Sequence, residues 1–182
     1  ILGAGLLGMG IAMCLRALGC GCRLFALARH DHQADLMRRA GVDEIIRSSS
    51  KDNQATRYAA VAANVGGQVL PSKFGHQAFA AGGFDVVYDC IGTGQTLTDA
   101  MKYARSRGTV VEVGTSQITM VDTCPLWFDE LTLIGANGRA FEDFEGRRLH
   151  TYQVVFALMA RGRLNLRGLL THRFRPEQYK QA

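Results

Sequence analysis

The sequence predicts an α/β fold with a doubly wound parallel sheet in a single domain, and two observations carry this prediction. The first is a glycine-rich turn near the start of the chain, at residues 3–8, which a segment of helical composition follows. The second is an alternation of apolar strand-like segments with amphipathic ones, in which several of the strands end in glycine. Such alternation is typical of βαβ units, whose parallel strands carry helices on both faces.

The glycine turn has the G-x-G-x-x-G spacing that holds the pyrophosphate of a dinucleotide in Rossmann-type folds. Gly3 lets the chain leave a strand tightly, Gly5 lets the phosphates approach bare backbone, and Gly8 lets the next helix pack closely on the sheet. The first N–H groups of that helix, at Leu6 and Leu7, and its positive dipole end then face the anion. The same spacing can arise by chance in a chain with 21 glycines. The neighbouring segments therefore decide whether this turn indicates a dinucleotide site.

The segments after the turn have the order and length of a βαβαβ series. Helical and strand-like patterns alternate, with helices at 9–18 and 34–40 and strands at 22–28 and 44–46. Only two residues precede the turn, whereas a strand needs about five. We therefore expect residues 1–182 to form one dinucleotide-binding domain that is truncated at both ends.

The rest of the chain contains one stretch without a clear secondary-structure pattern and one stretch with a regular pattern. Residues 48–83 contain several interrupting glycines and are expected to be an insertion or a mobile loop. Beyond them the pattern predicts strands at 84–90, 109–114 and 131–136 and helices at 96–106 and 147–161. In an open parallel sheet the ligand lies across the carboxyl ends of the strands, so Gly92, Gly114 and Gly135 mark the predicted binding edge.

The position about 20 residues after the last glycine of the turn contacts the adenosine ribose. An acidic side chain there favours NAD, but this chain has Ala28, followed by Arg29 and His30. A guanidinium can stack on adenine and pair with a 2′-phosphate, so the sequence predicts a preference for NADP. The alternative is that Arg29 is a solvated loop residue.

Composition narrows the classes of function. The chain has 47% hydrophobic residues, enough for one core, but no run of 18 apolar residues, so no membrane association is expected. Its net charge of +5 comes from basic residues that are spread out, which argues against a nucleic-acid partner. Five cysteines, an odd number, fit free thiols and a reducing, cytoplasmic location.

Together these segments resemble the cofactor domain of the medium-chain dehydrogenases/reductases, of the zinc-containing alcohol dehydrogenase type. The resemblance covers nearly the whole chain apart from residues 48–83. It rests on the segments 1–8, 39–45, 84–92, 107–114 and 131–135, followed by 169–174.

The resemblance implies a domain for hydride transfer between a nicotinamide cofactor, NADP or NAD, and an alcohol or carbonyl substrate. The turn would carry the pyrophosphate, and residues 28–30 would select the cofactor. The nicotinamide would be lined by the ends of two later strands, namely by Cys90, Ile91, Gly92, Val113, Gly114 and Thr115. Family members often form homodimers through the edge strand of this domain, here near residues 131–136, and an apolar edge strand is itself a template for pairing.

The chain departs from this family in one large respect. Relatives carry a preceding catalytic domain that supplies the zinc ligands and most of the substrate pocket, and none of it is found in these 182 residues. Zinc is therefore expected only in that other domain, and we assign no catalytic or metal-binding residue here. The chain alone is expected to be inactive.

The sequence bears on four other functions. A short-chain dehydrogenase needs Tyr-x-x-x-Lys, and none of Tyr58, Tyr88, Tyr103 and Tyr152 has lysine four residues later. A methyltransferase would prefer an acid where Ala28 stands. A stand-alone dinucleotide-binding module or sensor, and the cofactor domain of a zinc-independent quinone reductase, remain open alternatives.

Overall fold

The computed structural model describes residues 1–49, 51–71, 77–115, 118–138, 140–169 and 172–181. Its centre is a parallel sheet of β1 (Phe25–Ala28), β2 (Glu44–Arg47), β5 (Phe84–Asp89), β6 (Ala104–Glu112) and β7 (Thr132–Gly135). Leu2 joins its two halves, because it forms parallel bridges to both Leu27 and Asp89. The spatial order is therefore β2, β1, Leu2, β5, β6, β7.

The two residues before the glycine turn thus occupy the central strand position. The Leu2 amide donates to the Tyr88 carbonyl at 2.8 Å, and the Leu2 carbonyl accepts from the Cys90 amide at 2.9 Å. On the other side, the Leu27 amide donates to the Ile1 carbonyl at 3.0 Å. These bonds fix the point from which the turn leaves the sheet.

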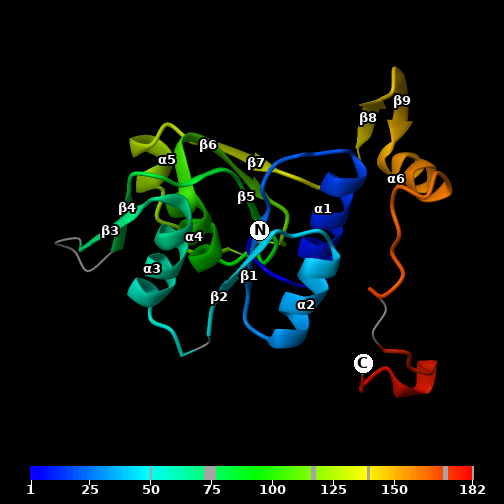
Figure 1. Cartoon of the computed structure of the whole chain (residues 1–182), viewed down its shortest axis with the longest axis horizontal. Coiled ribbons are helices and arrows are strands. Elements are labelled where there is room, and N and C mark those ends of the chain that lie inside the picture. Colours follow the sequence, from blue (N-terminus) through cyan, green and yellow to red (C-terminus); the bar gives the residue numbers. More distant parts are fainter. Residues whose placement is uncertain (50, 72–76, 116–117, 139, 170–171, 182) are drawn as a thin grey trace.

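Helices cover both faces of the sheet (Figure 1). On one face, α1 (Leu6–Ala17) and α2 (Asp31–Arg39) form a core with β1 in which Ala12, Ala26 and Met37 are fully buried. The other face is covered by α3 (Gln54–Val65) and α4 (Gly94–Tyr103), where Tyr58 of α3 and Met101 of α4 pack with strand residues such as Val110. The prediction of a doubly wound, Rossmann-type parallel sheet is confirmed.

Residues 48–83, predicted as an insertion or a mobile loop, include α3 and a short antiparallel hairpin of β3 (Gln68–Pro71) and β4 (Gln77–Ala80). The Asn53 side chain caps α3 by accepting from the Thr56 amide at 2.8 Å, and Gly66, with φ of 65°, ends it. α3 contributes Tyr58 and Val61 to the core. The described part of this stretch therefore includes a helix that covers the sheet.

The carboxyl-terminal third differs from its prediction. After α5 (Cys124–Phe128) and β7, the chain forms an antiparallel hairpin of β8 (Phe141–Phe144) and β9 (Arg147–His150), then α6 (Thr151–Ala160) and a short 3₁₀ turn (Pro176–Gln178). The predicted helix 147–161 is therefore wrong in its first turn. Glu145 and Gly146 adopt φ of 52° and 73°, which turns the chain back to pair β9 with β8, and the His150 side chain then caps α6.

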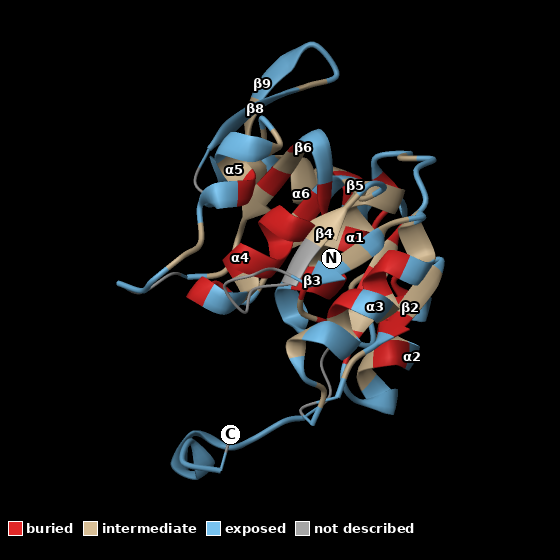
Figure 2. Cartoon of the chain, turned by 90° about the vertical axis from the view of Figure 1, so that its left-hand side faces the viewer, coloured by how far each residue is buried: buried red, intermediate tan, exposed pale blue. Residues whose placement is uncertain are grey.

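The side chains of α6 differ widely in exposure. Tyr152 and Phe156 are 61% and 66% exposed, whereas Leu158 is buried with Leu164 against Ala17 of α1. Figure 2 shows buried residues concentrated along the sheet and its helices, whereas the β8–β9 hairpin and the carboxyl-terminal segment are exposed. Within the described part of the chain, no helix is long and apolar enough to cross a bilayer.

Candidate dinucleotide-binding site

The sheet changes winding direction between Leu2 and β5. The chain leaves Leu2 toward α1, which packs with α2 on one face, and leaves β5 toward α4, which packs on the other. Two connections that diverge in this way open a crevice at the carboxyl edge of a parallel sheet. The predicted site residues of both connections therefore lie at one edge.

Each glycine of the turn has a distinct surrounding. Gly3 has φ of 97°, and a Cβ on it would come within 2.8 Å of Ile91 Cγ1. A Cβ on Gly8 would come within 2.0 Å of the Gly3 carbonyl oxygen, so only glycine fits there. A Cβ on Gly5 would meet no atom within 4 Å. Gly3 and Gly8 thus serve the fold, while the backbone at Gly5 borders open space.

The amino terminus of α1 begins at this space. Gly5 is its N-cap residue, no side chain caps the helix, and its first turn contains no acidic residue. The first N–H groups of a helix have no partner within it, and they carry the positive end of its dipole. Leu6 and Leu7, which follow Gly5, are 66% and 50% exposed. The arrangement suits an anion bound against bare backbone.

A buried aspartate, missed by the sequence analysis as a functional residue, shapes the second loop. Asp89, at 0% exposure, accepts through Oδ1 from the amides of Ile91 and Gly92 at 2.9 and 3.2 Å. Its other carboxylate oxygen accepts from the Thr96 hydroxyl at 3.0 Å. The signal in the sequence was an aspartate at the end of an apolar strand with glycine three residues on, a spacing that suits a side chain bonded to nearby amides.

Asp89 also ties this loop to the next one. Its backbone carbonyl accepts from the amides of Val113 and Gly114, both at 2.9 Å. The two loops then pack so closely that a Cβ on Gly92 would lie 2.6 Å from the Gly114 carbonyl carbon, and Gly92 has φ of 79°. The structure therefore brings residues 90–92 and 113–114 together, with exposed Thr115 next to them.

Cys90 is a half-buried free thiol at this edge. Burial raises its pKa to about 11, so it remains protonated at neutral pH. Its neighbour Ile91 is 44% exposed and lies against Gly3. The pair supplies a neutral, apolar surface rather than an acid, a base or a nucleophile.

The predicted ribose end lies at the carboxyl terminus of β1. Ala28 is 1% exposed and packs in the core with Ala26, so it offers no side-chain group to a ligand. Arg29 is exposed, and no carboxylate of the described chain pairs with it. His30 follows as the N-cap of α2, and its ring stacks on that of His32 at 5.5 Å.

One acidic residue near this end escaped the sequence analysis. Asp31, the first residue of α2, forms an ion pair with Arg47 of β2, with Oδ1 and Nη2 2.6 Å apart. Its charge is thus partly neutralised by a residue 16 positions away, which a local sequence pattern does not reveal.

The described residues contain no group of three His, Cys, Asp or Glu side chains that could hold a metal ion. At the edge itself, the functional groups are backbone amides, Asp89, Thr96 and Arg29. The amides and Arg29 can bind an anionic, aromatic ligand, and Asp89 and Thr96 hold the loop that would orient it.

Comparison with known proteins agrees with this geometry. A family model described as zinc-binding dehydrogenase matches residues 7–152. L-idonate 5-dehydrogenase of Vitis vinifera is 25% identical over 175 residues, which cover 96% of this chain and 41% of that protein. D-arabinitol dehydrogenase 1 of Uromyces fabae is 25% identical over 187 residues, covering 100% and 46%. The chain thus spans less than half the length of these relatives.

Among solved structures, a short chain alcohol dehydrogenase from Escherichia coli CFT073 complexed with NADH superposes with a TM-score of 0.68. The two sequences are 18% identical, and the match covers 99% of this chain and 45% of that one. At this identity the likeness concerns the fold, which agrees with the sheet order and the glycine turn described above.

Proposed function

The chain belongs to the medium-chain dehydrogenases/reductases of the zinc-binding type, as their cofactor-binding domain, and we propose that it binds NADP in preference to NAD. The observation that carries the binding is the open backbone at Gly5, ahead of a helix terminus that no side chain caps. The pyrophosphate would accept from the first amides of α1, at Leu6, Leu7 and Gly8, and meet the positive end of the helix dipole.

The nicotinamide would lie against the two loops that Asp89 holds together, at residues 90–92 and 113–115. Once bound, the nicotinamide itself supplies the hydride chemistry. The residues of this chain orient it: Asp89 fixes the loop backbone, and Cys90 and Ile91 offer an apolar surface. No step of proton transfer is assigned to a residue of this chain.

The preference for NADP rests on the ribose end. An acidic side chain that would repel a 2′-phosphate is absent at Ala28, and Asp31 is paired with Arg47. Arg29 is exposed and has no acidic partner in the described structure, so its guanidinium is available for a charge-assisted bond to the 2′-phosphate.

For the substrate we propose an alcohol or carbonyl compound of the polyol and sugar-acid type, since the relatives are named for L-idonate and D-arabinitol. Zinc, where the reaction uses it, would be held outside this chain. A stand-alone module that binds a dinucleotide without turnover, and a quinone reductase-like parent, are the alternatives. Substrate oxidation measured for a protein that contains this chain, with and without a zinc chelator, separates the three.

Calorimetric titration with NADPH and then NADH at fixed salt tests the cofactor proposal. We expect NADPH to bind more tightly, and Arg29→Ala to weaken NADPH by about 10- to 100-fold, as for loss of a charged hydrogen bond. NADH should change by less than about twofold. Arg38→Ala is the matched control, because Arg38 lies on α2 and pairs with Asp35 instead. Equal losses for both cofactors would contradict the role of Arg29.

We also propose that two copies pair through β7. Among the described strands β7 has β6 as its only neighbour, and Leu133 and Ile134 are 39% and 48% exposed. An apolar edge strand is a template for pairing. Sedimentation of a protein that contains this chain should show a dimer. Ile134→Lys should dissociate the dimer, and Leu70→Lys, on the exposed strand β3, should leave it intact. A monomer in the absence of either substitution would contradict the proposal.

A further inference from the structure

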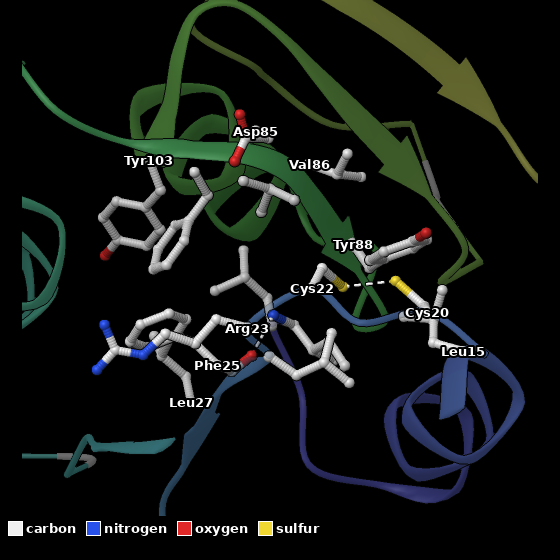
Figure 3. A pocket seen from close by; sticks show the side chains of 15 residues that line it. Leu15, Cys20, Cys22, Arg23, Phe25, Leu27, Asp85, Val86, Tyr88 and Tyr103 are labelled. Atoms are coloured by element: carbon white, nitrogen blue, oxygen red, sulfur yellow. Dashed lines mark hydrogen bonds between the residues drawn. The ribbon is translucent and has the colours of Figure 1, made fainter. Parts of the chain in front are cut away.

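Two thiols meet at the opposite end of α1 from the glycine turn. Cys20 and Cys22 lie in the connection from α1 to β1, with their sulfur atoms 2.7 Å apart in a shared hydrogen bond. Both are free thiols; Cys20 is half-buried and Cys22 is exposed. They line a cavity of about 260 Å³ at the amino edge of the sheet, as Figure 3 shows. Neither takes part in the dinucleotide site described above.

Arg16 holds this loop in place. Its Nη1 donates to the carbonyls of Cys20 at 2.9 Å and Cys22 at 2.8 Å, on both sides of Gly21. Its Nε donates to the Gly41 carbonyl at 2.9 Å, and its Nη2 pairs with Asp43 Oδ2 at 2.5 Å. One side chain thus anchors the loop to the segment before β2. The approach of the two sulfur atoms is therefore a property of the fold rather than of a free loop.

We propose that Cys20 and Cys22 form a thiol–disulfide exchange site that reacts with low-molecular-weight disulfides. The Cys20 thiolate attacks one sulfur of the small disulfide, forming a mixed disulfide and releasing one thiol after protonation. Cys22 then gives up its proton and attacks Cys20 Sγ, which releases the second thiol and closes the Cys20–Cys22 disulfide. The protein loses two electrons and two protons, and the small disulfide gains both as two thiols.

The surroundings assign the two roles. The hydrogen bond between the two thiols, then a hydrogen bond with the Cys22 backbone and the positive charge of Arg16, lower the pKa of Cys20, whereas the bond between the thiols raises the pKa of Cys22. The thiolate is the attacking species in exchange, so Cys20 attacks and Cys22 resolves. Burial raises the pKa of Cys14 and of Cys90, and neither is paired with another thiol in a hydrogen bond.

The Cys20–Cys22 disulfide would be reduced easily back to two thiols. A disulfide that closes so short a loop removes little entropy from the unfolded chain, so it stabilises the protein only slightly. Exposed disulfides of this kind have relatively high reduction potentials and are the labile ones. The site therefore suits reversible modification and not a structural cross-link.

The test is incubation with oxidised glutathione, followed by intact-mass and peptide-mapping mass spectrometry. In the unmodified sequence the peptide that holds Cys20 and Cys22 should lose two hydrogens, mapped to a Cys20–Cys22 disulfide, and neither of these two cysteines should retain glutathione. Cys22→Ser should retain one glutathione on Cys20, because the resolving thiol is gone. Cys124→Ser, which removes an exposed thiol elsewhere, is the matched control and should form the same disulfide.

Rates complete the test. Cys20 should react faster than the exposed Cys124, because Arg16 and a second thiol lie beside Cys20. The proposal is overturned if the unmodified sequence retains glutathione on Cys20 or Cys22, or if Cys20→Ser reacts at the other position as fast as Cys22→Ser reacts at Cys20. Peptide mapping of the unmodified chain decides alone if a variant does not fold. The result does not depend on the dinucleotide proposal.

Discussion

The two ends of α1 present opposite kinds of chemistry. At its amino terminus the site is made of backbone without side chains: Gly3 and Gly8 fit only as glycine, and Gly5 leaves bare backbone beside open space. At its carboxyl terminus the chain gathers side chains, where Arg16 binds Asp43 and the loop that carries two thiols. One 12-residue helix connects the two regions.

This difference separates two ways of making a site. Backbone amides and a helix dipole recognise an anion without side-chain specificity, so the residues that matter there are those that stay small. Side-chain sites depend instead on partners brought from elsewhere in the chain, as Asp43 is brought to Arg16 from 27 positions away. The effects of substitutions at the two ends of α1 should therefore be detected by different measurements.

Gly8→Ala should produce the largest effect, and it should be an effect on folding. The added Cβ would lie 2.0 Å from the Gly3 carbonyl oxygen, and backbone on both sides limits relaxation. We expect the free energy of unfolding to fall by about 3 kcal/mol or more, measured by urea denaturation. Gly10→Ala is the matched control, because its Cβ meets nothing within 4 Å. It should raise stability by up to about 1 kcal/mol through helix propensity. Similar results for the two would contradict close packing at the turn.

Gly5→Val should act on binding and leave the fold nearly unchanged. Its side chain would enter the open space beside the helix terminus, where Gly5 has extended backbone that valine also adopts. Calorimetry should show NADPH and NADH weakened alike by about 100-fold, or about 2.7 kcal/mol. Gly10→Val adds the same side chain on the same helix away from the turn and should bind normally. Unchanged affinity in Gly5→Val would remove the turn from the proposed site.

The amino end of α1 was predictable from the sequence because its causes are local. The spacing of Gly3, Gly5 and Gly8 is written in six consecutive residues, and the strands at 84–90 and 109–114 overlap the observed β5 and β6. Short periodic patterns of this kind carry most of the information on a doubly wound sheet. The family resemblance rested on the same segments, and the matched residues 7–152 include most of them.

What escaped prediction depends on contacts between distant residues. Asp89 resembles any strand-end aspartate until its carbonyl is seen to bind the amides of the loop after β6. The apolar pattern of residues 147–161 favours a helix throughout, but pairing with β8 converts its first turn to a strand. The ion pair of Asp31 with Arg47 likewise joins residues 16 positions apart, and Arg16, which holds the thiol loop, is itself bound by Asp43 from 27 positions away.

Asp43 should give the smallest effect, confined to the carboxyl end of α1 and dependent on pH. The Leu24 amide and then the Arg16 charge lower the pKa of Asp43 below its usual value. A group whose pKa is lower in the folded state stabilises the protein above its unfolded pKa and loses that contribution as the pH falls toward the folded pKa. At pH 7 we expect Asp43→Asn to cost about 1 kcal/mol, because the pair is partly exposed. That difference should shrink below about pH 4.

Urea denaturation at pH 7 and at about pH 3 measures this change. Asp35→Asn, in an exposed pair with Arg38 on α2, is the control and should be nearly neutral at both. Dinucleotide affinity of Asp43→Asn at pH 7 should match that of the unmodified chain, because the turn is held by its own glycines and by Ile91. A loss of affinity in this variant would show that the two ends of α1 are coupled. The helix would then transmit the state of the thiol loop to the dinucleotide site, and the separation drawn between backbone and side-chain sites would fail.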